Sequence, residues 1–317
     1  MNNDNQWPSG CLKIPSKFLA DSWDDCKKIT REVEDFFSKK FGYPCILLPS
    51  GRSAISLSLQ ALNINRHNIV FAPNFSSYCV WNVLGRHSNP SVNIRKDTDL
   101  ILAVHKYAEI YSLEEAESQP KIIEDSCDSL ITNQDNIFPL GGAYEIFSLP
   151  KIMGTYGGGL LACLNTDYEN KAREIIEGSS KIHHSQGHLR WQFHNGINDK
   201  YNIWEANEFQ NFTLDMTALH QIKDNLDAFE LNQKIIESRL SHLTQEYKEL
   251  NITFDKGRLP PVITLSNIKQ TSNLMYRMID INKSLDNPLY QNEAILPLHF
   301  GIKDEEFSHL IKSVHVE

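Results

Sequence analysis

The chain has 317 residues, of which 41% are hydrophobic and 22% charged, which suits one large globular domain plus a smaller one. No apolar run approaches the roughly 18 residues of a membrane-spanning helix, and the polar first residues argue against a signal peptide. A net charge of −9 without a basic block argues against nucleic acid and anionic membranes as partners. Six scattered cysteines without CxxC pairs indicate reduced thiols, so we expect a cytoplasmic protein without a disulfide or zinc framework.

The first half of the chain alternates predicted helices with predicted strands. After an irregular segment over 1–20, apolar spacing predicts a helix over 24–40. Further along, we expect strands at 43–48, 67–72, 92–95, 100–105 and 121–123, with helices at 51–62, 77–86 and 113–118. This alternation predicts a mostly parallel sheet covered by helices on both faces, and such sheets bind ligands beyond the carboxyl ends of their strands.

A single lysine stands between two further predicted strands. A strand at 144–147 runs into Ser148, Leu149, Pro150 and Lys151, and a glycine-rich turn at 154–159 leads into a strand at 159–164. Glycine allows the backbone to adopt positive φ and to approach a ligand closely. This stretch alone fits a lysine placed for chemistry and a solvated hairpin lysine equally well.

A second motif, Pro49-Ser50-Gly51-Arg52-Ser53, joins a predicted strand to a predicted helix. Amides at a helix N-terminus and small hydroxyl side chains form a site for an anion such as phosphate. The GxxxxGK[ST] spacing of a nucleotide-binding loop is absent. An ordinary helix N-cap by Ser50 and Ser53 is the simpler explanation of this motif taken alone.

Three polar groups therefore follow apolar strands: the turn 50–53, the pair Glu124 and Asp125, and the segment 148–151. A parallel sheet brings them to one crevice. Pyridoxal phosphate (PLP) needs this set of groups, because its phosphate binds amides and hydroxyls, its pyridine nitrogen binds a carboxylate and its aldehyde bonds to a lysine.

The second half of the chain has a different pattern. We expect a helix at 168–177, a polar loop rather than a metal site in the histidine-containing segment 181–198, and a long helix at 215–250 with at most one break. Strands at 251–254, 262–265 and 294–299 and a helix at 303–314 then suggest a small α+β unit. The predicted organisation is a large α/β domain at 1–215, a connecting helix at 216–250 and a small domain at 251–317.

Taken in order, these motifs resemble the DegT/DnrJ/EryC1/StrS family of sugar aminotransferases. The resemblance runs from about Phe41 to the C-terminus, and it is carried by the segments LPSGRSAISLSLQAL, IVFAPNFSSYCVWNVL, LILAVHKYAEI, KIIEDSCDSL, FSLPKIMGTYGGGLLACLNTD, NFTLDMTALHQIKDNLDAFELNQKIIESRL and ILPLHFGIKDEEFSHLIKSV. It implies the aspartate-aminotransferase-like fold, PLP as cofactor, and transfer of an amino group from glutamate to a keto group of a nucleotide-linked sugar. The pathway implied is surface-polysaccharide or antibiotic-sugar biosynthesis.

The resemblance also implies roles for individual residues. Lys151 matches the Schiff-base lysine that moves protons, and Asp125 matches the carboxylate on the pyridine nitrogen. Asn211 matches an asparagine that reaches the cofactor of a neighbouring subunit, which implies a homodimer with shared sites. The phosphate-binding turn implied by the resemblance contains Gly51, Arg52 and Ser53. The implied contacts near the cofactor ring are Asp128, Ser148 and one stacking side chain, either Phe75 or Tyr78.

Four departures from the family pattern stand out. Asp128 occupies a position that is usually glutamine or histidine, and Thr213 replaces an arginine. The segment before Lys151 is about two residues shorter than usual, and the region between Pro261 and Ile295, which helps to form the substrate pocket in the family, is also shortened. These changes affect the expected sugar substrate more than the expected cofactor.

Three alternatives remain at this stage. A PLP-dependent sugar dehydratase is disfavoured by Lys151, because related dehydratases carry histidine there. A non-catalytic relative that binds the cofactor or a sugar nucleotide is compatible with Asp128 and the shortened region. A serine acyl-enzyme built on Ser148 is disfavoured because we expect a strand and a proline around this serine rather than a helix beginning at it.

Overall fold

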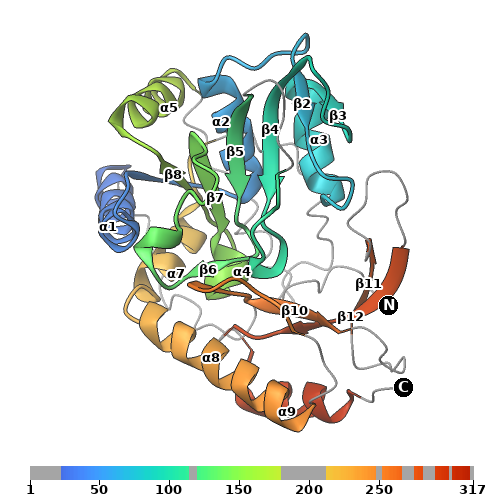
Figure 1. Ribbon diagram of the computed structural model, residues 1–317. Helices are drawn as coiled ribbons and strands as arrows, with labels where there is room; N and C mark the ends of the chain where they lie inside the picture. The colour runs from blue at the N-terminus through green and yellow to red at the C-terminus, as the bar shows by residue number, and fades with distance from the viewer. Residues whose placement is uncertain are drawn as a thin grey trace, which may run out of the picture.

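The computed structural model describes residues 23–113, 120–179, 212–247, 252–265, 275–280, 290–299 and 302–314. A seven-stranded sheet with helices on both faces forms the larger part, and a smaller sheet lies beyond one end of its strands (Figure 1). The predicted α/β class is thereby confirmed.

The large sheet has the strand order β1-β8-β7-β5-β4-β2-β3. Its strands are β1 (Cys45–Leu48), β2 (Ile69–Phe71), β3 (Asn89–Ser91), β4 (Thr98–Val104), β5 (Lys121–Asp125), β7 (Tyr144–Ser148) and β8 (Gly159–Cys163). Strand β8 runs antiparallel to β1 and β7, and the other pairs are parallel. The carboxyl ends of β1, β7, β5, β4 and β2 therefore meet at one edge of the sheet.

Helices cover both faces because successive side chains of a strand point to opposite sides. In β1, Ile46 and Leu48 join the core beneath one set of helices, whereas Cys45 and Leu47 join the core on the other face. The first set is α2 (Gly51–Ala61), α3 (Tyr78–His87) and α5 (Thr166–Gly178). The second set is α1 (Trp23–Phe41), α7 (Met216–Asp224) and α8 (Phe229–Glu246).

The C-terminal part adds a three-stranded antiparallel sheet in the order β10-β12-β11. Its strands are β10 (Val262–Leu265), β11 (Met275–Asp280) and β12 (Tyr290–Pro297), and α9 (Asp304–Lys312) follows. A separate short pair, β6 (Leu130–Ile131) with β9 (Arg258–Leu259), connects this part to the segment after β5.

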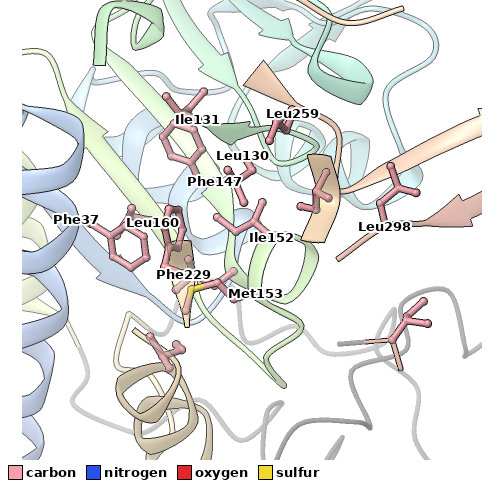
Figure 2. Packing of buried hydrophobic residues seen from close by; sticks show 14 of the residues in the cluster. Phe37, Leu130, Ile131, Phe147, Ile152, Met153, Leu160, Phe229, Leu259 and Leu298 are labelled. Carbon is pink, nitrogen blue, oxygen red and sulfur yellow. The ribbon is translucent and has the colours of Figure 1, made fainter. Parts of the chain in front are cut away.

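One hydrophobic core joins the two parts. Ile152 and Met153, from the short helix α4 (Leu149–Met153), belong to the same buried cluster as Leu259 and Leu298. Figure 2 shows these side chains together with Phe147 of the large sheet. The end of β7 is therefore packed from below by the C-terminal part.

Two predicted strands are wrong. The strand expected at 92–95 lies earlier, at β3, because Ser91 Oγ accepts a hydrogen bond from Asn93 N at 3.1 Å and turns the chain away. Residues 252–254 form no strand; Asp255 N instead donates to Ala108 O at 3.0 Å, which holds the segment against the loop after β4.

The long helix predicted at 215–250 is two helices. Asn225 ends α7, because its backbone N–H donates to Gln221 O and Ile222 O and its side chain donates to Gln221 O at 2.6 Å. The predicted helix at 113–118 and the loop at 181–198 lie mainly or wholly outside the described residues. Of the helices that are described, none combines the length and the apolar character needed to cross a membrane.

Candidate active site

Lys151 lies between the end of β7 and the glycine-rich turn, as predicted, on α4, a helix of five residues that was not predicted. Pro150 is in the first turn, where its missing N–H costs nothing, and Gly154 ends the helix with φ of 66°. So short a helix is not stable by itself. Residues of α7 and α8 hold its end: Gln221 Oε1 accepts from Tyr156 N at 2.6 Å, and the Asn232 side chain donates to Ile152 O.

The glycines after α4 bring the phosphate-turn candidate beside it. Gly158, with φ of +114°, donates its N–H to Pro49 O at 2.8 Å and accepts from Leu149 N at 3.1 Å. A Cβ on Gly159 would lie 2.3 Å from the carbonyl carbon of Ser50. Glycine is required here because two backbone segments approach more closely than a side chain permits.

The turn itself forms the N-terminus of α2. Ser50 is the N-cap, and its Oγ accepts from Ser53 N at 3.1 Å. Arg52 lies in the first turn with a half-buried side chain, and this turn contains no acidic residue. A Cβ on Gly51 would lie 2.8 Å from Cys127 Sγ, so this backbone is packed closely against the loop after β5. The helix dipole and the serine hydroxyls make this turn suitable for a phosphate.

Asp125 ends β5 and is buried, and its Oδ1 accepts from Cys127 N at 3.0 Å. Burial raises the pKa of Asp125 above its usual value, against the opposing effects of Cys127 and of the Lys151 charge. Three residues further on, Asp128 Oδ1 accepts a hydrogen bond from Lys151 Nζ at 2.7 Å. The structure thus brings Lys151, Asp125 and Asp128 together.

A second group behind Asp125 was missed by sequence reasoning. We call Ser126, Glu145 and Arg258 the Arg258 cluster. Arg258 Nη1 donates to Ser126 Oγ and Nη2 donates to Glu145 Oε1, each at 2.8 Å, and both charged side chains are fully buried. The sequence feature that could have indicated this cluster is Arg258 itself, an arginine beside the apolar residues of the strand pair β6–β9. Likewise, Gln221 and Asn232 were polar interruptions on an apolar helical face.

The two stacking candidates lie in different environments. Phe75 is half-buried, with Lys106 Nζ 5.0 Å from its ring centroid and Tyr111 6.2 Å away. Tyr78 begins α3 and its side chain is 74% exposed. This difference favours Phe75. Asn211, the residue predicted to reach the cofactor of a neighbouring subunit, lies outside the described residues.

The reason given against a serine acyl-enzyme is wrong, because α4 begins immediately after Ser148. The thiol of Cys127 is not suited to attack a carbonyl. Burial raises its pKa well above the usual value, and the neighbouring Asp125 adds to this effect. At this sheet edge, Lys151 has both a charged partner, Asp128, and access to solvent, with 23% of its side chain exposed.

The comparisons with known proteins agree with this arrangement. A family model described as "Putative PLP-dependent aminotransferase" matches residues 36–316. The chain belongs to this family of PLP-dependent aminotransferases. No curated protein sequence matches the chain.

Solved structures of aminotransferases have the same fold. A DegT/DnrJ/EryC1/StrS aminotransferase from Brucella abortus has a TM-score of 0.62 and 14% identity, covering 90% of this chain and 89% of its own. The aminotransferase TlmJ from Streptoalloteichus hindustanus has a TM-score of 0.61 and 12% identity, covering 95% and 97%. NtdA from Bacillus subtilis, solved with pyridoxamine phosphate, has a TM-score of 0.55 and 15% identity, covering 90% and 77%. The aspartate-aminotransferase-like fold is confirmed.

The residues of the site fit PLP, the cofactor of this family. Three observations support this fit. The carboxylate of Asp125 is buried, and the amine of Lys151 is accessible to solvent. At the N-terminus of α2, the backbone of Gly51 lies so close to Cys127 that a Cβ would not fit there. The charge of Lys151 lowers the pKa of Asp125 against the larger effect of burial, and the charge of Asp125 raises the pKa of Lys151.

Proposed function

We propose that this aminotransferase moves an amino group from glutamate to a keto group of a nucleotide-linked sugar. The observation that carries the proposal is the combination of Lys151 on α4 with the buried Asp125 at the end of the neighbouring β5. The sugar is supported by the fold shared with Spr1654 of Streptococcus pneumoniae, which is described as a sugar aminotransferase and matches 90% of this chain. The donor rests on the resemblance noted in the sequence.

Each residue at the sheet edge has a role in this proposal. The turn at the start of α2, with Gly51, Arg52 and Ser53, binds the cofactor phosphate, and Asp125 accepts a hydrogen bond from the ring nitrogen. When bound, PLP supplies an aldehyde and an electron-withdrawing ring. Lys151 Nζ would take the proton from the amine-bearing carbon of the donor and pass it to the cofactor, and it would make the reverse transfer to the sugar carbon in the second half-reaction.

Several further features belong to the same proposal. Phe75 packs against the cofactor ring, and Ser148 and Asp128 line the site from the ends of β7 and β5. Asn211 reaches the site of a second copy, so the working unit is a homodimer, which a molar-mass measurement in solution tests. The cytoplasm is the proposed location because Cys45, Cys79, Cys127 and Cys163 are all thiols.

The test compares wild type with Lys151→Ala after incubation with PLP. We expect a visible absorption band that changes on addition of glutamate in wild type only, and a loss of about 10²–10⁴-fold in transfer rate for the variant, because a positioned acid–base group contributes about that factor. The matched control is Lys223→Ala, which removes an exposed lysine paired with Glu32 at 2.8 Å and leaves activity unchanged.

Product analysis then separates the alternatives. Gain of an amine on a keto-sugar nucleotide supports the proposal, whereas loss of water identifies a dehydratase. A band that no amino donor changes identifies a cofactor-binding relative. Completion of both half-reactions by Lys151→Ala would show that the assigned mechanism is wrong.

A further inference from the structure

Asp128 forms an ion pair with the lysine on which the proposed reaction depends. Lys151 Nζ and Asp128 Oδ1 are 2.7 Å apart, and the two side chains are 23% and 16% exposed. Lys151 projects from α4 and Asp128 from the loop after β5, so the pair bridges two neighbouring strand ends. At this distance a charge-assisted hydrogen bond is strong and favours the charged forms of both groups.

The neighbouring carboxylates favour a charged Lys151, as this bond does, and burial opposes them. Burial lowers the pKa of Lys151, but the charge and the hydrogen bond of Asp128, together with the charge of Asp125, outweigh this effect and hold the pKa above its usual value. Asp128 is on the loop after β5, and Asp125 is the last residue of that strand. An ammonium group has no lone pair, so Lys151 in this state cannot attack a carbonyl carbon.

We propose that Asp128 is a positioning residue that holds Lys151 as an ammonium in the cofactor-free chain and thereby sets the pH at which this lysine becomes a nucleophile. The inference rests on the proposed function in so far as Lys151 is the residue that bonds to the cofactor. Removal of the carboxylate leaves the lysine neutral, and reactive, at a lower pH.

The reactivity of Lys151 is measured without cofactor by trace labelling with acetic anhydride over a series of pH values. The neutral amine forms an amide bond to one acetyl group, acetate leaves and the amine proton passes to the buffer. Mass spectrometry quantifies acetylation of Lys151 relative to Lys223 in the same sample. We expect the labelling midpoint of Asp128→Asn to fall by about 1–3 pH units, the usual effect of an opposite charge at this distance.

Two variants serve as controls. Asp128→Glu keeps a carboxylate and stays closer to wild type than Asp128→Asn. Asp97→Asn removes the carboxylate of an exposed pair with Arg95, at 3.1 Å, and leaves the Lys151 midpoint unchanged. Circular dichroism checks folding, and Asp128→Ser replaces Asp128→Asn if that variant is unfolded. An unchanged midpoint in the folded neutral variant overturns the inference.

This experiment fails separately from the test of function. If the midpoint shifts but wild type neither binds PLP nor transfers an amine, the proposed function fails and the role of Asp128 in holding the lysine stands. If wild type binds PLP and transfers an amine while the midpoint does not shift, the proposed function stands and the role of Asp128 fails.

Discussion

Two ion pairs flank the end of β5, and they differ in how firmly they are held. Lys151 and Asp128 lie on the side of the candidate site, with 23% and 16% of their side chains exposed. Glu145 and Arg258 lie behind it with no exposure. The charged atoms are 2.7 Å apart in the first pair and 2.8 Å apart in the second, so distance alone does not distinguish them.

The difference lies in the burial of the second pair and in the hydrogen bonds that hold it. Arg258 also donates to Ser126 Oγ and to Asn136 O, and Glu145 also accepts from Phe138 N. A buried charge needs this degree of saturation, because its desolvation is costly. Lys151 has access to solvent and can leave its carboxylate. The pair behind the site is suited to fixing the loop that carries Asp125, and the pair in the site is suited to reacting.

We expect the largest effect from Arg258→Met. The substitution leaves Glu145 as a buried, uncompensated carboxylate, so we expect a loss of about 3–5 kcal/mol in the free energy of unfolding, measured with urea. The control Arg95→Met removes an exposed arginine paired with Asp97 and costs less than about 1 kcal/mol. An equal, small loss for both variants would show that the Arg258 cluster does not anchor the fold.

A second fixed arginine extends the comparison to the C-terminal part. Arg239 of α8 donates to Leu298 O, His299 O and Ile302 O, at 2.8–2.9 Å. Burial lowers the pKa of His299 to about 4, and the charge of the nearby Arg239 adds a smaller effect in the same direction. The unfolded chain therefore binds a proton between about pH 6.5 and pH 4 that the folded chain does not bind.

The expected result is a loss of stability as the pH falls through this window. This lowering of the His299 pKa contributes about 3 kcal/mol to the free energy of unfolding above pH 6.5. That contribution is lost as the pH falls from 6.5 to 4. His299→Gln cannot take up the proton, so its urea unfolding free energy falls less over the same interval. Parallel pH profiles for wild type and His299→Gln would contradict the assignment.

The smallest expected effect belongs to the pair in the site. Asp128→Asn removes the attraction to Lys151, but it also removes the cost of partly burying a carboxylate, so we expect the free energy of unfolding of the cofactor-free chain to change by less than in Arg258→Met. Urea unfolding beside Arg258→Met measures the contrast directly. A loss as large as that of Arg258→Met would mean that both pairs are structural, and that Lys151 is not free to leave Asp128.

Much of this arrangement could be predicted from the sequence because the decisive signals are local. Each strand end carries its own polar residue, and a parallel sheet brings those ends together, which placed Lys151, Asp125 and the turn at Ser50 at one edge. The break between α7 and α8 was foreseen as an option, and the position of β3 was missed because its pairing with β2 overrides its weak local propensity.

The remainder depends on contacts between distant segments. Helix α4 is too short to show apolar periodicity, and it depends on Gln221 and Asn232 far along the chain. The direction of Asp128 depends on how its loop packs, and Arg258 reaches Ser126 only through the pairing of β6 with β9. Sequence patterns predict which face a residue occupies, and they do not predict which partner from another segment meets it there.

The position of β1 has a consequence for synthesis of the chain. It is an edge strand whose one neighbour in the large sheet is β8, with Cys45 opposite Ala162. During translation β1 leaves the ribosome first among the strands of this sheet, yet its backbone partner is the last of them to be made. Such distant pairing slows folding. The turn between β1 and α2 is therefore completed late, and a nascent chain that ends before β8 lacks a finished phosphate site.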